Sequence, residues 1–214
     1  MRWSLFLFTC FIFQLALTLC SLALVIPETE ELVVRRRGRA RKAPTKIKDH
    51  SSNTRDKGLE GSEYWDIGEK GIESKPISGL GTDADKKAMI KDKDADHLLE
   101  SQVVEKALRD QGKTFQSLDP NTRTEINKIM NSKENIRFVP KRINRSKGQV
   151  FKNALKHRKS VKTKDADRDK YIHETLPQAK DVAKKVDDAL KKGGYKGNVF
   201  QTLMGAVKSI GQRK

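Results

Sequence analysis

The residues of this 214-residue sequence that could do catalysis or bind a metal ion are four histidines and two runs of alternating aspartates. A nucleophilic site needs a base beside a nucleophile, and a zinc site needs several ligands at short, fixed spacings. The histidines show neither arrangement; they are His50, His97, His157 and His173. The sequence therefore predicts no catalytic residue, no metal ligand, no cofactor and no small-molecule substrate, and a protein that is not an enzyme.

The aspartates alternate in Asp92–Asp96 and again in Asp165–Asp169, as they do at the start of a calcium-binding loop. Such a loop needs glycine at its sixth position, where this chain has His97 and Lys170. Carboxylates also stabilise the first turn of a helix, because they face its positive dipole end. We interpret both runs as the acidic starts of helices.

A second group of residues with chemical consequences is the basic one, because the formal net charge is +17. Residues 35–49 hold eight Lys or Arg and one Asp, and residues 134–164 hold eleven Lys or Arg and one Glu. Clustered cations bind phosphate or sulfate polymers through counterion release. Few aromatic residues lie among them, so stacking on bases is not expected.

The second basic block predicts a contact with a polyanion, either a glycosaminoglycan or a nucleic acid. Its spacing also resembles a bipartite nuclear import signal, and the remaining alternative is a solvated surface. The residues assigned to this basic segment are Lys141, Arg142, Arg145, Lys147, Lys156, Arg158 and Lys159.

The first basic block follows an apolar leader, Leu5–Ile26, that holds no charged residue. With Arg2 before it and small residues near Cys20 and Ala23, the leader is typical of a secretory signal peptide, residues 1–23. It is also long enough to be an uncleaved anchor, which would hold the rest of the chain in the cytosol. Both cysteines, at positions 10 and 20, lie in the leader, so a cleaved chain would contain no thiol.

Residues 24–42 are predicted to be a propeptide that ends in a basic processing site. Arg36 and Arg39 fit the R-x-x-R pattern of secretory convertases, and Arg41 with Lys42 forms a dibasic site. An exposed, flexible segment of this kind is open to proteases.

Asn144 begins the sequence Asn-Arg-Ser, an acceptor pattern for N-glycosylation. The pattern has meaning only if the chain enters the secretory pathway. We treat Asn144 as a candidate glycosylation site on that condition.

Residues 43–94 read as a disordered linker, because Gly, Ser, Pro and alternating charges leave no apolar periodicity. Tyr64, Trp65 and Ile67 interrupt it. We interpret them as a loop whose aromatic rings rest on the helical part, with a short docking motif as the alternative.

Residues 95–214 carry the elements that must position any site, and their pattern is helical. Asp94 and Asp96 are expected to cap a first helix, Asp119 and Pro120 start a second, and Asn198 caps the last. One further segment, residues 137–143, hints at an extended strand, and Pro140 weakens it as a central strand of a sheet.

Two stripes of apolar residues define the last two helices, and the first of these helices is expected to end at Gly193. We expect the two helices to pack against each other as an antiparallel hairpin. The predicted core residues of these stripes are Ala179, Val182, Ala183, Val186, Ala189, Leu190, Val199, Phe200, Leu203, Met204, Ala206, Val207 and Ile210. The fold class is mainly α: a small helical bundle of marginal stability in the C-terminal half, after a disordered basic and polyampholytic arm.

These observations predict a secreted, non-enzymatic, basic protein, processed from a precursor, that binds a partner protein or a polyanion. One alternative is an effector-like secreted protein that enters the nucleus of a target cell. A second is a membrane-anchored protein with a cytosolic helical body.

Overall fold

The computed structural model describes residues 47, 51–157 and 164–211, which belong to one of the chain's two compact units, Ala43–Lys214. The predicted signal peptide, the propeptide 24–42 and the processing residues Arg36, Arg39, Arg41 and Lys42 lie outside the described residues. Within the part that the structure describes, no helix has the length and apolar character needed to cross a bilayer. The leader prediction stays a prediction.

The described part of this unit contains a four-stranded mixed sheet, in the order β2-β1-β4-β3. The strands are β1 (Glu63–Gly68), β2 (Gly71–Pro76), β3 (Lys93–His97) and β4 (Ile136–Pro140). β1 and β2 form an antiparallel hairpin, and Gly71 has a φ of +91° at its turn, a backbone conformation that glycine adopts without strain. β1 runs parallel to β4, and β4 pairs antiparallel with β3.

The prediction of a disordered linker over residues 43–94 is wrong for residues 51–94. Besides the hairpin, this stretch contains α3 (Ser51–Leu59), the 3₁₀ turn η1 (Ile77–Gly79) and α4 (Asp83–Lys91), whose N-cap residue Thr82 forms a capping box. The strands are short and polar on their outer face, so they show too few apolar residues for a sequence signal. Trp65 and Tyr64 are buried in β1 and do not lie in a loop.

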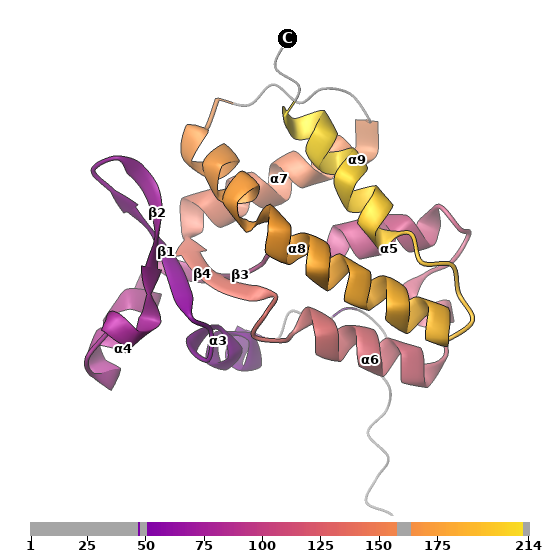
Figure 1. Ribbon diagram of the computed structural model, residues 1–214, viewed down its shortest axis with the longest axis horizontal. Coiled ribbons are helices and arrows are strands. Elements are labelled where there is room, and N and C mark those ends of the chain that lie inside the picture. Colours follow the sequence, from indigo (N-terminus) through magenta and orange to yellow (C-terminus); the bar gives the residue numbers. More distant parts are fainter. Residues whose placement is uncertain (1–46, 48–50, 158–163, 212–214) are drawn as a thin grey trace, which may run out of the picture. The chain divides into compact units, whose positions relative to one another are not determined.

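Helices supply most of the described structure, so the prediction of a mainly α fold is confirmed, with the sheet as an addition that was not foreseen. The C-terminal helices are α5 (Ser101–Arg109), α6 (Pro120–Met130), α7 (Lys141–His157), α8 (Ala166–Lys192) and α9 (Val199–Gly211), and η2 (Phe115–Ser117) is a 3₁₀ turn between α5 and α6 (Figure 1).

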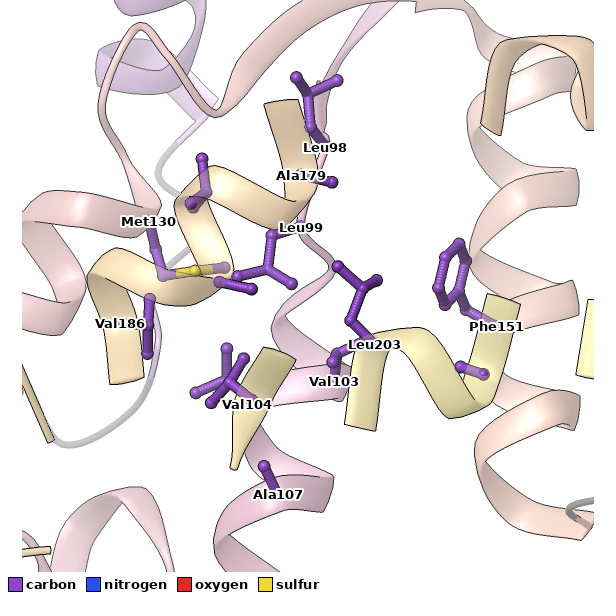
Figure 2. Packing of buried hydrophobic residues seen from close by; sticks show 14 of the residues in the cluster. Leu98, Leu99, Val103, Val104, Ala107, Met130, Phe151, Ala179, Val186 and Leu203 are labelled. Carbon is purple, nitrogen blue, oxygen red and sulfur yellow. The ribbon is translucent and has the colours of Figure 1, made fainter. Parts of the chain in front are cut away.

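One apolar core joins these helices. Figure 2 shows Val104 of α5, Met130 of α6, Phe151 of α7, Val186 of α8 and Leu203 of α9 around one interior. All of the stripe residues predicted on α8 are buried, and four of the seven predicted on α9 are buried while the rest are half-buried. Burying these faces is what holds α9 against α5, α7 and α8.

The helix ends agree in part with their sequence signals. Asp119 caps α6 and Pro120 is its first residue, as predicted. Asp165 caps α8, and Gly193 ends it. Asp94 and Asp96 do not cap a helix, because they lie in β3 and the residue at the N-cap of α5 is Glu100.

The N-terminus of α9 is held by a residue of another helix. The buried Asp187 of α8 accepts hydrogen bonds from the backbone N–H groups of Val199 (2.7 Å) and Phe200 (3.0 Å). A carboxylate at this point satisfies N–H groups that have no partner inside the helix. Asp187 therefore takes the capping position that the sequence suggested for Asn198, and it ties α9 to α8.

The extended segment expected over residues 137–143 is confirmed in part as β4, and this strand is central in the sheet although it contains Pro140. Pro140 is the last residue of β4, opposite Lys93 at the start of β3. The missing N–H group therefore affects only the final position of the hydrogen-bond ladder.

Candidate functional site

A pocket of about 310 Å³ lies at the end of β3 on the described residues, and we call it the β3 pocket. It is formed by residues from α3, β3, the start of α5 and the first turns of α7. Its lining residues are Thr54, Arg55, Asp94, Ala95, Asp96, His97, Glu100, Ser101 and Asn144. Three carboxylates, an imidazole, a guanidinium and an amide thus surround one cavity.

The pocket exists because β3 leads directly into α5 and β4 leads directly into α7. His97 ends β3 and Ser101 begins α5, while Pro140 ends β4 and Lys141 begins α7. Antiparallel pairing places Pro140, at the end of β4, opposite Lys93 at the start of β3, so α7 begins there and runs back along β3, and α3 contacts both strands. Asn144 then donates a hydrogen bond to Asp94 across the pocket (3.2 Å).

Behind the pocket lies a buried ionic cluster made of Asp96, Glu100, Lys147 and Tyr171. Lys147 is 1% exposed, and its ammonium donates to both carboxylate oxygens of Asp96 (2.9 and 2.8 Å) and contacts Glu100 (3.0 Å). The Tyr171 hydroxyl donates to Asp96 (2.8 Å). These bonds fasten β3 to α7 and α8, and they hold the Asp96 carboxylate in the pocket wall.

Burial and pairing perturb the ionisable groups of this cluster. Burial raises the pKa of Asp96, and the Lys147 ammonium opposes that rise. Burial alone would lower the pKa of Lys147, but the charges of Asp96 and Glu100 raise it above its ordinary value. Burial, reinforced by Asp96, raises the pKa of Tyr171 well above the ordinary value. Strongly perturbed groups beside a cleft are a common mark of a functional site.

An aromatic contact supports the cluster from the sheet side. The indole of Trp65 in β1 meets the ring of Tyr171 edge to face, with 5.1 Å between the ring centroids. Both side chains are buried. The hairpin that the sequence left unassigned therefore helps to fix Tyr171, and through it Asp96.

The structure separates the residues of the predicted basic segment. Lys147 is buried in the ionic cluster, so it cannot contact a polyanion in this fold. Arg142 is bound by Asp165 (2.9 Å) and Asp167 (2.8 Å), and Lys141 donates to the backbone carbonyl of Lys91 (3.0 Å).

The other members of the segment differ. Arg145 and Lys156 are exposed on α7, and Arg158 and Lys159 lie outside the described residues. Lys156 lines a separate groove between α5 and α7, with a volume of about 390 Å³. Only part of the segment is therefore presented to a partner.

Asn144 is not placed like a glycosylation acceptor. It lies within α7, its amide is bonded to Asp94, and its side chain is half-buried in the β3 pocket. A glycan on that nitrogen would have to fit in the pocket, and the use of this site stays a prediction.

Of the two histidines whose side chains the structure describes, His97 lines the β3 pocket and His173 is exposed on α8. His50 and the side chain of His157 lie outside the described residues. Within the described ranges, no group of three or more His, Cys, Asp or Glu is arranged to hold a metal ion.

The pocket could not be predicted from the sequence because its residues are far apart along the chain. Arg55, His97 and Asn144 come from three segments that no motif connects. One signal for the pocket was present in the sequence. The polar residues Asp94, Asp96 and His97 come directly before Leu98 and Leu99, which are buried, so polar side chains lie next to the core.

Comparisons with known proteins add no relative, since no family model, no curated protein and no solved structure matches this chain.

Proposed function

We propose that this protein is a hydrolase that cleaves an ester bond in an anionic substrate, and that the β3 pocket is its active site. The single observation that carries this proposal is the convergence of Asp94, His97 and Glu100 with Arg55 and Asn144 in one cavity. A pocket with convergent polar groups and perturbed ionisable residues is the default candidate for an active site.

The candidate general bases in the pocket are His97 and Asp94. Each has a side chain suited to general-base catalysis, which removes a proton from water as it attacks the ester. Asn144 bonds to Asp94 and so fixes the orientation of that carboxylate. Glu100 is engaged by Lys147 and Gln102 and serves to shape the pocket wall.

The groups that favour a negative charge are Arg55 and the N-terminus of α5. Arg55 comes from α3, where it also donates to the backbone carbonyl of Ile90 (3.3 Å), which holds the guanidinium beside the pocket. Ser101 is the first residue of α5 and lines the cavity. The backbone N–H groups of a helix start attract anions, and a guanidinium binds phosphate well. Arg55 and the start of α5 are the features that favour a phosphoester as the substrate, against the three carboxylates that line the same cavity.

Hydrolysis of bis(p-nitrophenyl) phosphate tests the proposal. Purified protein is assayed between pH 6 and 8, once with a chelator and once with added Mg²⁺. We expect His97→Ala and Asp94→Asn each to reduce the rate by about 10²- to 10⁴-fold, the range for loss of a general base.

His173→Ala is the matched control, because it removes an exposed histidine of α8 outside the pocket. It should keep the wild-type rate. Circular dichroism and melting temperature confirm that each variant folds. Absence of hydrolysis by the wild type under every condition, or a His97→Ala rate equal to the wild-type rate, contradicts the proposal.

The competing proposal is the non-enzymatic one: a secreted basic protein that acts only by binding, or an effector that enters a target nucleus. It depends on cleavage of the leader and on the exposed cations. Intact mass of the natural protein tests the processing step, since an N-terminus at residue 21 or 24 would leave the propeptide in place. Recovery of an uncleaved chain in membranes would instead support the anchored form.

A further inference from the structure

We propose that the groove between α5 and α7 binds the phosphate backbone of a nucleic acid. We call it the α5–α7 groove, and it is lined by Gln102, Lys106, Arg109, Lys152, Leu155 and Lys156. Four of these six residues are cations. The inference rests on the proposed function in one respect, because it names the substrate class that would reach the β3 pocket.

The charge of α7 is unusual for a surface helix. Its 17 residues contain no acidic residue, whereas α8 has six acidic and seven basic residues in 27. Like charges one turn apart destabilise a helix. A stripe of unbalanced cations is therefore a cost to the fold, which a bound polyanion would remove.

Exposure and spacing put three cations of α7 on one line. Arg145, Lys152 and Lys156 are exposed, and their separations of seven and four residues place them on the same face of the helix. At 1.5 Å per residue they cover about 17 Å of axis. One strand of a duplex presents about five phosphates over that length, at 3.4 Å each.

The partners of these cations differ across the groove. Lys106 is paired with Asp110, and Arg109 lies 3.9 Å from Glu105. Lys152 has no ion-pair partner among the described residues, and the same is true of Lys156. These two lysines are the part of the groove whose charge is not already compensated within the protein.

The groove and the β3 pocket share the same two helices. α5 begins at the pocket with Ser101, and α7 reaches it with Asn144. Asn144 and Leu155 are eleven residues apart, close to three whole turns, so they lie on one face of α7. Between them, the Gln102 amide donates to the Gly148 carbonyl (2.9 Å) and joins the helices. A polymer in the groove is thus directed along α7 toward the pocket.

The lining of the groove suits contacts to the phosphate backbone of a nucleic acid and not to its bases. No aromatic residue lines the groove, so contacts are to the backbone and carry no sequence information. Such binding depends strongly on salt, because it releases counterions.

Fluorescence anisotropy with a labelled 20-base-pair DNA duplex of arbitrary sequence tests the inference. The chain as purified is titrated at several salt concentrations, without turnover. We expect Lys152→Ala/Lys156→Ala to weaken binding about tenfold at low salt and to reduce the slope of log Kd against log salt by about 2, one phosphate for each lysine.

The matched control is Lys184→Ala/Lys185→Ala, which removes two exposed lysines of α8 and the same net charge. It should change binding less than threefold. Equal losses in both double variants would show that only net charge matters, and they would overturn the inference. Binding of heparin with no binding of DNA would overturn the choice of nucleic acid.

DNA binding by the groove and hydrolysis in the β3 pocket are measured in separate assays, so either proposal can fail without the other. His97→Ala is expected to bind DNA as the wild type does, whether or not the wild type hydrolyses a phosphoester. Loss of binding in the groove variant with no hydrolysis in the wild type would support the groove and reject the active site.

Discussion

Replacing Lys147 by Met tests whether the buried ionic cluster holds the sheet to the helices. The change leaves the volume of the side chain similar but removes the only cation among the described residues that contacts Asp96. The Asp96 residue is 3% exposed. Breaking a buried pair by removing one partner costs about 3–5 kcal/mol.

A second estimate of this cost comes from proton binding. Without Lys147, Asp96 can stay buried only by taking up a proton. Its ordinary pKa is 3.8, so protonation at pH 7 costs about 4 kcal/mol, at 1.36 kcal/mol for each pH unit. At pH 5 the same step costs about 1.6 kcal/mol.

The direction in which the stability of the Lys147→Met variant changes with pH follows from this protonation of Asp96. In the variant the folded pKa of Asp96 is raised above the unfolded value, so the folded state gains stability as the pH falls from 7 to 5. We expect Lys147→Met to lower the melting temperature by about 6–20 °C at pH 7, at 2–4 °C for each kcal/mol, and by clearly less at pH 5.

Differential scanning calorimetry with a double-mutant cycle measures the coupling. Adding Asp96→Asn to Lys147→Met removes both charges, keeps an acceptor for Tyr171 and should recover most of the lost stability. Lys191→Met is the control, because its partner Asp188 is 3.8 Å away and both side chains are about two-thirds exposed. Its melting temperature should stay at the wild-type value.

Two results would refute this reasoning. If Lys147→Met melts within about 2 °C of the wild type at pH 7, the cluster does not stabilise the fold. If the loss is as large at pH 5 as at pH 7, protonation of Asp96 is not what limits it.

Three further predictions concern the same unit. Asp187→Ala leaves two N–H groups of α9 without their acceptor and should lower the free energy of unfolding by about 1–2 kcal/mol in urea titrations. Lys147 and Tyr171 have raised pKa values in the folded state, so stability should fall as the pH rises above about 10, and Tyr171→Phe should make this decline less steep. Gly58→Ala places a Cβ 2.8 Å from the fully buried Phe138 ring and should cost about 1–3 kcal/mol, although alanine favours helix.

The helices that could be predicted from the sequence are those whose signals are local. The stripe of α8 repeats within one segment, and Asp119 and Gly193 mark helix ends by their own chemistry. No distant residue has to be known for these predictions. The core faces of α8 and α9 followed from periodicity alone, because a half-buried helix has a fixed repeat.

The sheet could not be predicted because its pairing is not local. Tyr64 pairs with Phe138 across 74 residues, and the strands that meet there have only five or six residues each. The runs Asp92–Asp96 and Asp165–Asp169 have aspartates at the same spacing. Which run becomes a strand and which a helix start depends on pairing with β4.

The β3 pocket and the buried ionic cluster depend on the same few residues. Lys147 follows Asn144 by one turn of α7, so the bond that anchors the helix to Asp96 also sets the position of the amide in the pocket. A change in the cluster therefore displaces Asn144 relative to Asp94 even where the protein stays folded. Sites of this kind need supporting side chains fixed to within a fraction of an ångström. It follows that the Lys147→Met/Asp96→Asn variant, although stable, should lose phosphoester hydrolysis if the β3 pocket is the active site.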